Sequence, residues 1–213
     1  MCYDDNARVP EAPGSAGPVR SELITLTAAD GNRFHAFTAV PASGAPATKA
    51  VLIYPDIRGL HQFYCDLAIR FAERGLPAIA IDYFGRTAGP TSRAEGFEFM
   101  PHVQQFTLGG FTQDVTAALA WLRAHVQSNV RVYVVGFCIG GSLTLVTGAN
   151  RAHGFAGLIP FYAGLSRAFG EAGTALDNGN RVCAPVEAFF GGADGGIPLS
   201  AVQALDERLD EAG

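Results

Sequence analysis

Largely apolar runs alternate along this chain with segments in which apolar residues recur every three or four positions. The runs at 50–54 and 77–84 are typical of strands buried on both faces of a parallel sheet. Between them, 61–74 has the period of an amphipathic helix and stops at Gly75. Such alternation predicts an α/β fold, a mostly parallel sheet with helices on both faces. The same pattern predicts further strands at 131–135, 156–162 and 185–190, and further helices at 111–126, from about 142, and at 197–212.

The start of the chain has a different pattern from the rest. Residues 1–20 are rich in Pro, Gly and Ala, and we expect them to form an extended arm. Strands at 21–27 and 33–40, joined by a turn at Asp30, predict a β-hairpin at one edge of the sheet. No internal repeat or second shift in composition follows, so 21–213 is expected to be one domain.

The segment 131–150 carries the clearest chemical signal. A strand runs into Gly136-Phe137-Cys138-Ile139-Gly140 and continues as an apolar helix, which is the nucleophile-elbow pattern with Cys in place of Ser. The helix start favours a thiolate at Cys138, and the N–H of Ile139 is placed to stabilise an oxyanion. The same motif is also compatible with an unreactive buried thiol, or with glycines that only allow close packing of strand and helix. The strand before the motif and the helix after it favour the nucleophile.

Composition narrows the class of protein. The chain has 213 residues with 15 basic and 20 acidic side chains, and its net charge of −5 argues against a nucleic-acid surface. No run is long and apolar enough for a membrane span, and the N-terminus lacks the apolar core of a signal peptide. The default expectation is a cytoplasmic enzyme, a monomer or a small homo-oligomer, without nucleic-acid or membrane partners. The four cysteines, which have neither metal-ligand nor disulfide-framework spacing, are Cys2, Cys65, Cys138 and Cys183.

Candidate residues follow the ends of three predicted strands. In parallel sheets catalytic groups gather at the carboxyl ends of the strands. Asp56 and Ile57 follow one strand, and the N–H of Ile57 would be a second oxyanion donor. Asp194 follows another strand, after Cys138 in sequence, where the acid of a triad belongs. As alternatives, Asp56 is only a turn residue and Asp194 only caps the next helix.

A fourth strand end leads into the long connection 85–110. Arg86 lies there and would bind a substrate carboxylate bidentately, or else is a surface residue. A connection of this length in a compact domain is usually a functional loop or a lid.

Four motifs together resemble the dienelactone hydrolase family of α/β-hydrolases. They are PDIRGLHQFY at 55–64, AIDYFGR at 80–86, GFCIGG at 136–141 and FFGGADGGIP at 189–198. The resemblance extends from Ser21 to the end of the chain. The Cys within GFCIGG is its most specific feature, because most α/β-hydrolases use Ser.

The resemblance implies a Cys–His–Asp triad that opens lactone or ester bonds without a cofactor. The type reaction of the family converts a dienelactone to maleylacetate during the breakdown of aromatic compounds. The implied roles are nucleophile for Cys138, acid for Asp194, oxyanion donors for Ile57 and Ile139, and substrate carboxylate binding for Arg86. The resemblance also places Asp56 where the type enzymes carry a Glu that pairs with the resting thiol.

This sequence departs from the family in two respects. Asp56 is one methylene shorter than Glu, which puts its contact with Cys138 in doubt. The triad histidine, which the family places beyond the helix that follows Asp194, does not occur before Gly213. We therefore expect a truncated sequence, in which a further strand and a histidine follow position 213.

The histidines that are present leave the function open. His61 adjoins the oxyanion loop and His102 lies in the long connection, so either could line the pocket, but neither has the order position of a triad base. His35, His125 and His153 are expected to be surface, packing or loop residues. The main alternative to a cysteine hydrolase is a binding protein without catalysis on the same fold. A general carboxylesterase or thioesterase, in which Cys replaces Ser, is a further alternative.

Overall fold

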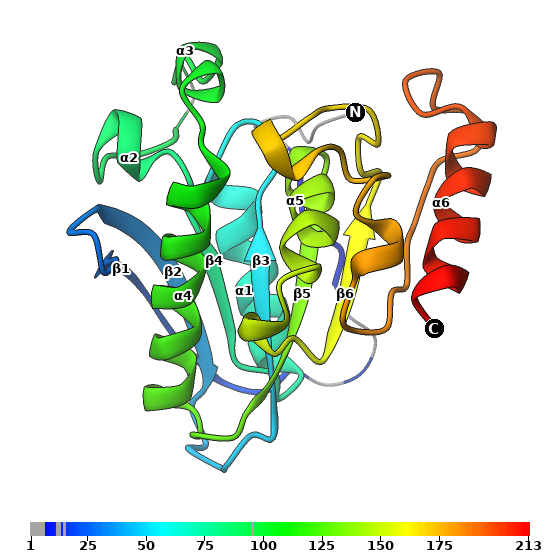
Figure 1. The fold of residues 1–213 in the computed structure, drawn as a ribbon. Coiled ribbons are helices and arrows are strands. Elements are labelled where there is room, and N and C mark those ends of the chain that lie inside the picture. The colour runs from blue at the N-terminus through cyan, green and yellow to red at the C-terminus, as the bar shows by residue number, and fades with distance from the viewer. Residues whose placement is uncertain (1–6, 12–13, 15, 95) are drawn as a thin grey trace.

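The computed structural model describes residues 7–11, 14, 16–94 and 96–213, and its centre is a twisted sheet. In this part of the chain six strands pair in the order β1-β2-β4-β3-β5-β6 (Figure 1). Strands β4, β3, β5 and β6 are parallel, while β2 pairs antiparallel with both β1 and β4. The mostly parallel sheet with a hairpin at one edge is therefore confirmed. The strands are β1 (Val19–Thr27), β2 (Arg33–Pro41), β3 (Lys49–Tyr54), β4 (Ala78–Ile81), β5 (Arg131–Phe137) and β6 (Gly157–Phe161).

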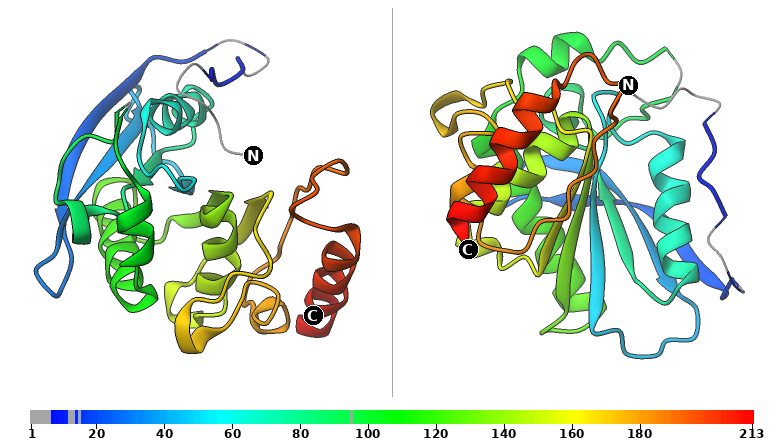
Figure 2. Two further views of the ribbon diagram at one scale, coloured as in Figure 1. Left: turned by 90° about the horizontal axis from the view of Figure 1, so that it is seen from above. Right: turned by 90° about the vertical axis from the view of Figure 1, so that its right-hand side faces the viewer.

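Helices cover both faces of the sheet. Helix α1 (Gln62–Glu73) lies on one face, and α4 (Leu108–His125), α5 (Ile139–Gly148) and α6 (Leu199–Ala212) lie on the other (Figure 2). None of the helices described here is both long and apolar enough to cross a membrane. The remaining short helices are α2 (Gly85–Ala88), α3 (Met100–Gln104), η1 (Arg151–His153), η2 (Gly170–Ala172) and η3 (Gly179–Arg181).

The central strand β3 shows why its sequence is apolar throughout. Successive side chains of a strand point to opposite faces. Leu52 and Tyr54 accordingly join the buried cluster under α4 and α5, while Val51 and Ile53 join the cluster under α1. Both faces of the strand are excluded from water, so no polar position interrupts the run.

The predicted N-terminal arm ends earlier than position 20, because β1 begins at Val19. Its described residues have no regular secondary structure, and residues 1–6, 12, 13 and 15 lie outside the described part of the chain. The arm follows helix α1: the N–H of Gly17 donates to the carbonyl of Glu73, and Arg74 donates to the carbonyl of Gly14. Val9 packs against the apolar cluster on the α1 face.

The strand predicted at 185–190 forms only in part. Two isolated parallel bridges join this segment to β6, at Leu158 with Val186 and at Phe161 with Phe189. The segment therefore runs beside β6 in the predicted direction without a continuous ladder. Pro160 of β6 interrupts the ladder, since it has no N–H to donate toward Glu187, whereas Leu158 and Tyr162 donate to the carbonyls of Pro185 and Phe189.

The long connection 85–110 is more ordered than its sequence suggested. It contains α2 and α3, and α4 begins at Leu108, three residues before the predicted start. A buried ion pair holds the connection to the sheet, with Nη2 of Arg93 2.8 Å from Oδ2 of Asp82 and both side chains 1% exposed. The sequence analysis did not identify this pair, because a lone Arg in a polar loop gives no periodic signal.

Candidate active site

The turn between β5 and α5 has the geometry of a nucleophile elbow. Cys138 has φ 56° and ψ −118°, a conformation that L-residues rarely adopt and that costs about 1–3 kcal/mol. A Cβ on Gly136 would lie 2.2 Å from the carbonyl oxygen of Gly140. A Cβ on Gly140 would lie 2.3 Å from the carbonyl oxygen of Pro55. The turn itself therefore requires Gly136, whereas Gly140 is required by the close packing of α5 against the end of β3.

Helix α5 begins directly after Cys138, three residues earlier than predicted. The side chain of Cys138 is half-buried at this helix N-terminus, where unpaired N–H groups and the helix dipole favour an anion. Among the hydrogen bonds of the described residues, none uses the backbone N–H of Ile139 or of Ile57. Both donors therefore remain available for an oxyanion.

Strand register brings Asp56 to the same place as Cys138. Strands β3 and β5 are parallel neighbours, and Tyr54 pairs with Gly136 at their carboxyl ends. Asp56 and Cys138 each lie two residues beyond this pair. Neighbouring strands are about 4.8 Å apart, so the two residues emerge side by side at this edge of the sheet.

The loop after β3 is held by three hydrogen bonds to Asp56. Its N–H donates to the hydroxyl of Tyr64 over 3.0 Å, and the hydroxyl of Tyr83 donates to its carbonyl oxygen. The N–H of Arg58 donates to carboxylate Oδ1 over 2.9 Å. Burial, reinforced by the charge of Asp56, raises the pKa of Tyr64, so this hydroxyl stays protonated. The oxyanion donor Ile57 lies within this fixed loop.

The carboxylate of Asp56 is fully buried, and its second oxygen, Oδ2, has no hydrogen-bond partner among the described residues. The role of Asp56 beside the Cys138 thiol stays a prediction. The other oxygen, Oδ1, lies 3.6 Å from Nε2 of His61.

Asp194 lies in the turn that follows the partly formed strand 185–190. The side chain is half-buried, and Oδ1 accepts the N–H of Gly196 over 2.9 Å. This is the turn geometry that the sequence left as an alternative to the triad role. None of the five histidines, all of which are described, forms a hydrogen bond with Asp194, so its catalytic role stays a prediction.

Arg86 is occupied by carboxylates of the protein. Its guanidinium donates to both oxygens of Asp114, over 2.8 Å and 3.0 Å, and to Asp30 over 2.6 Å. Asn32 donates to the same Asp114, so the network joins the hairpin, α2 and α4. The expectation that Arg86 binds a substrate carboxylate is not supported, because two carboxylates already neutralise it. Burial raises the pKa of Asp114 although Arg86 opposes the shift.

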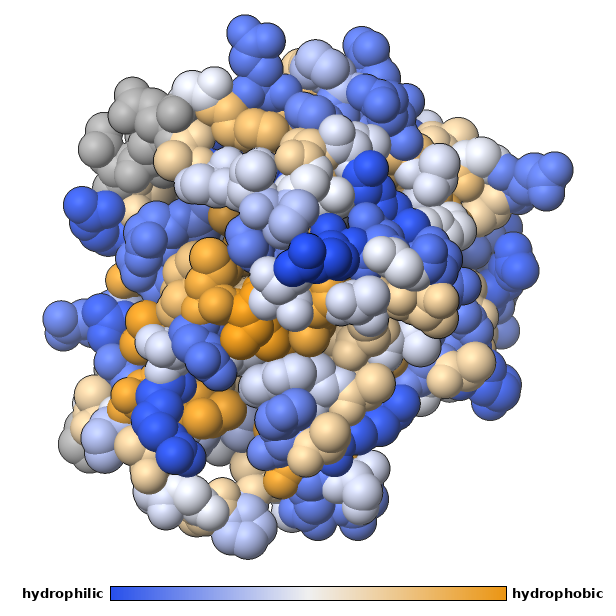
Figure 3. Space-filling model, turned by 90° about the vertical axis from the view of Figure 1, so that its left-hand side faces the viewer, coloured by the Kyte–Doolittle hydropathy of each residue, from blue (hydrophilic) through white to orange (hydrophobic). Residues whose placement is uncertain are grey.

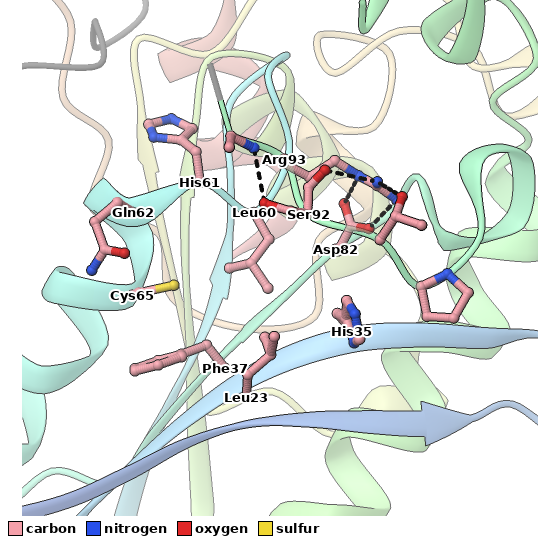
Figure 4. Close-up of a pocket in the computed structure, with 13 residues that line it drawn as sticks. Leu23, His35, Phe37, Leu60, His61, Gln62, Cys65, Asp82, Ser92 and Arg93 are labelled. Atoms are coloured by element: carbon pink, nitrogen blue, oxygen red, sulfur yellow. Dashed lines mark hydrogen bonds and ion pairs between the residues drawn. The ribbon is translucent and has the colours of Figure 1, made fainter. Parts of the chain in front are cut away.

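A cavity of about 520 Å³ lies between the β1–β2 hairpin, the start of α1 and residues 90–94 (Figure 4). On this side of the molecule hydrophobic residues gather in a hollow surrounded by hydrophilic ones (Figure 3). His61 lines this cavity, whereas neither His102 nor Cys138 does, so the prediction that His61 lines the pocket of the nucleophile is not tested by it. Cys65 also lines it, and burial raises the pKa of its thiol to about 12, which makes it unreactive.

The other histidines have structural partners. His102 is bonded to Thr87 and stacked on Phe97, and His125 is stacked on Trp121. His35 contacts Thr25 within the hairpin, and His153 is buried at the end of α5.

The family model of the dienelactone hydrolase family matches residues 34–213, which include every element from β3 onwards. The chain belongs to the dienelactone hydrolase family. Among similar proteins, this family member is 26% identical over 185 residues to a candidate carboxymethylenebutenolidase of Methylorubrum extorquens. It is 28% identical over 150 residues to the carboxymethylenebutenolidase of Pseudomonas putida. These alignments cover 84% and 65% of the chain.

The fold of this family member is also that of solved structures. A candidate dienelactone hydrolase from Klebsiella pneumoniae superposes with a TM-score of 0.81 at 22% identity, covering 92% of this chain and 82% of that one. The fold is therefore an α/β-hydrolase fold. The chain spans about three fifths of the length of the two curated relatives, 62% and 61% respectively.

Proposed function

We propose that this protein is a hydrolase that opens lactone or ester bonds through an acyl-enzyme intermediate on Cys138. The observation that supports it most strongly is the backbone of Cys138, with φ 56° between β5 and α5. Such strain persists only where the surrounding structure enforces it, and here two glycines and a helix N-terminus present a thiol at the carboxyl edge of the sheet.

In the proposed reaction the thiolate of Cys138 attacks the carbonyl carbon of the substrate. The negative charge that develops on the carbonyl oxygen is stabilised by the N–H groups of Ile57 and Ile139. When the tetrahedral intermediate collapses, the C–O bond of the ester or lactone breaks, and a histidine oriented by Asp194 donates a proton to the departing oxygen. The same histidine then takes a proton from water, which attacks the acyl carbon and breaks its bond to sulfur, so that the acid is released and the thiolate is restored. In the family pattern this histidine lies beyond the helix that follows Asp194.

The proposed substrates are small lactones or esters, as the names of the curated carboxymethylenebutenolidases imply for those proteins. A carboxylate on the substrate is left out of the proposal, since Arg86 is paired within the protein. We place the protein in a reducing compartment such as the cytoplasm, because Cys65, Cys138 and Cys183 form no disulfide bond with one another.

Replacement of the nucleophile tests the proposal. The Cys138→Ala variant should hydrolyse p-nitrophenyl acetate at least about a thousandfold more slowly, because acyl transfer then lacks its acceptor atom. The matched control is Cys183→Ala, which removes a half-buried thiol that bonds only to backbone carbonyls. Undiminished turnover by Cys138→Ala, with the control equally active, would contradict the function.

A further inference from the structure

Asp56 and His61 form a buried pair at the oxyanion loop. Asp56 is 0% exposed and His61 is 6% exposed. Nε2 of His61 lies 3.6 Å from Oδ1 of Asp56. Within the described residues both Nε2 of His61 and Oδ2 of Asp56 are buried without a hydrogen-bond partner.

Burial of such a pair is unfavourable unless a donor faces the carboxylate. A buried carboxylate is stable as an anion only where donors or positive charge face it. The backbone N–H of Arg58 is one donor to Oδ1, and a hydrogen on Nε2 of His61 is the other donor within reach. A bare nitrogen lone pair facing a carboxylate oxygen would be repulsive, so the geometry favours the His61 tautomer that carries its hydrogen on Nε2.

The loop is also close to other ionisable groups. The hydroxyls of Tyr64, on α1, and Tyr83, after β4, both meet the backbone of Asp56. The Asp82–Arg93 pair lies beneath the loop, since a Cβ on Gly59 would be 3.0 Å from Oδ1 of Asp82. Asp82 is paired with Arg93, and His61 faces the Asp56 carboxylate through Nε2.

The position of this pair relates it to the nucleophile. Register places Asp56 opposite Cys138, and Gly140 packs against the backbone of Pro55. An ionised carboxylate beside Cys138 opposes formation of the thiolate, because two negative charges repel each other. The opposition decreases when a donor shares the negative charge of the carboxylate.

We propose that His61 is a positioning residue for acyl transfer. Its Nε2–H faces the Asp56 carboxylate and partly compensates the negative charge beside which the Cys138 thiolate forms. This inference rests on the proposed function, in which Cys138 is the nucleophile. In this proposal the effect of His61 passes through Asp56.

The test is a double-mutant cycle on the full chain, read from the pH dependence of Cys138 alkylation by iodoacetamide. Mass spectrometry of the Cys138 peptide separates this thiol from the other cysteines. His61→Phe should raise the midpoint of the alkylation curve by about one pH unit, which slows labelling about tenfold near neutral pH. In an Asp56→Asn background the same substitution should have no further effect, because the charge that His61 compensates is gone.

Two further variants distinguish the polar contact between His61 and Asp56 from simple packing. His61→Gln retains an amide donor near the position of Nε2 and should keep the wild-type midpoint, whereas the shorter His61→Asn should shift it as His61→Phe does. If His61→Phe does not fold, the Gln and Asn pair decides the question alone. His125→Phe, which replaces an exposed histidine on α4, is the control and should leave the curve unchanged.

Equal midpoints for His61→Gln, His61→Asn and wild type would overturn the inference. So would a shift by His61→Phe that persists in full in the Asp56→Asn background. Neither result depends on ester hydrolysis: unchanged turnover by Cys138→Ala would refute the proposed function, while the alkylation cycle refutes only the role of His61.

Discussion

At the scale of single residues, the site depends on a backbone conformation of Cys138 that L-residues rarely adopt. Cys138 has positive φ, and the two glycines around it allow the strand and the helix to approach each other closely. The cost of the conformation is offset by the packing of β3, β5 and α5 around it. A methyl group added at either glycine should therefore act on the thiol as well as on stability.

The first prediction concerns Gly140→Ala. The new Cβ would lie 2.3 Å from the carbonyl oxygens of both Tyr54 and Pro55, so the turn must shift. We expect destabilisation of at least about 1–3 kcal/mol and slower alkylation of Cys138. Gly192→Ala is the matched control, because nothing lies within 4 Å of its Cβ. Urea unfolding and Cys138 labelling measure both effects, and equal behaviour of the two variants would contradict the account.

The elbow could be predicted from sequence, but the partners of several residues could not. The conformation of Cys138 follows from a local steric rule that acts over five residues. Arg86, in contrast, is neutralised by Asp114, 28 positions later, and by Asp30 in the hairpin. Only the tertiary fold brings these groups together, and a sequence pattern around Arg86 carries no sign of them.

At the scale of elements, the long connection after β4 is held to the sheet by one buried ion pair. Arg93 donates to Asp82 and to the carbonyl of Gly89, and it lies 4.5 Å over the ring of Phe97. Burial raises the pKa of Asp82 in spite of Arg93. Asp82 would therefore be strongly unfavourable as an unpaired anion.

The second prediction follows from this pair. Arg93→Met should destabilise the protein by about 3–5 kcal/mol, because it leaves a buried carboxylate without its partner. Arg70→Met serves as the control, since Arg70 pairs with Glu73 at a partly exposed position and should cost no more than about 1 kcal/mol. Urea unfolding measures the difference. Similar losses for the two variants would show that the Asp82 pair is not required.

The third prediction concerns the end of α5, where His153 is buried and neutral. Nδ1 donates to the carbonyl of Thr147, and Nε2 accepts from the side-chain amide of Asn150. Burial, together with the charge of Arg123, lowers the pKa of His153 below its usual value of about 6.5. The unfolded chain therefore binds a proton first as the pH falls.

Stability from His153 should be complete above about pH 6.5 and should be lost as the pH falls toward the lowered pKa. His153→Gln should remove this part of the pH dependence, seen as a smaller change in unfolding free energy between about pH 7.5 and about pH 5. His125→Gln, at an exposed position, should leave the dependence unchanged. An unaltered slope in His153→Gln would refute the neutral assignment.

Which elements could be predicted depended on whether their signal was local. Strand β3 and helix α1 follow from periodicity and occur within a residue or two of their expected bounds. Residues 185–190 have the composition of a strand, but Pro160 of β6 supplies no N–H in the middle of the pairing, so only isolated bridges form. Helices α2 and α3 are shorter than a periodic pattern can reveal.

At the scale of the whole molecule, the proposed nucleophile, oxyanion donors and acid lie at one edge of a single sheet. The parallel strands β3 and β5 deliver Asp56, Ile57 and Cys138 to adjacent positions, and the segment after β6 delivers Asp194 to the same edge. The fold is set by apolar burial on both faces of the strands, while the chemistry is confined to the loops that follow them. The central claim is that Cys138, among the cysteines of this chain, accepts the acyl group.

Trapping of the acyl-enzyme tests this claim most directly. The protein is mixed briefly with p-nitrophenyl acetate, quenched in acid, and analysed by peptide mass mapping. We predict one acetyl group per chain on the peptide that contains Cys138, and none in the Cys138→Ala variant. Hydrolysis of the ester without an adduct on Cys138, or with the acetyl group on another residue, would contradict the account.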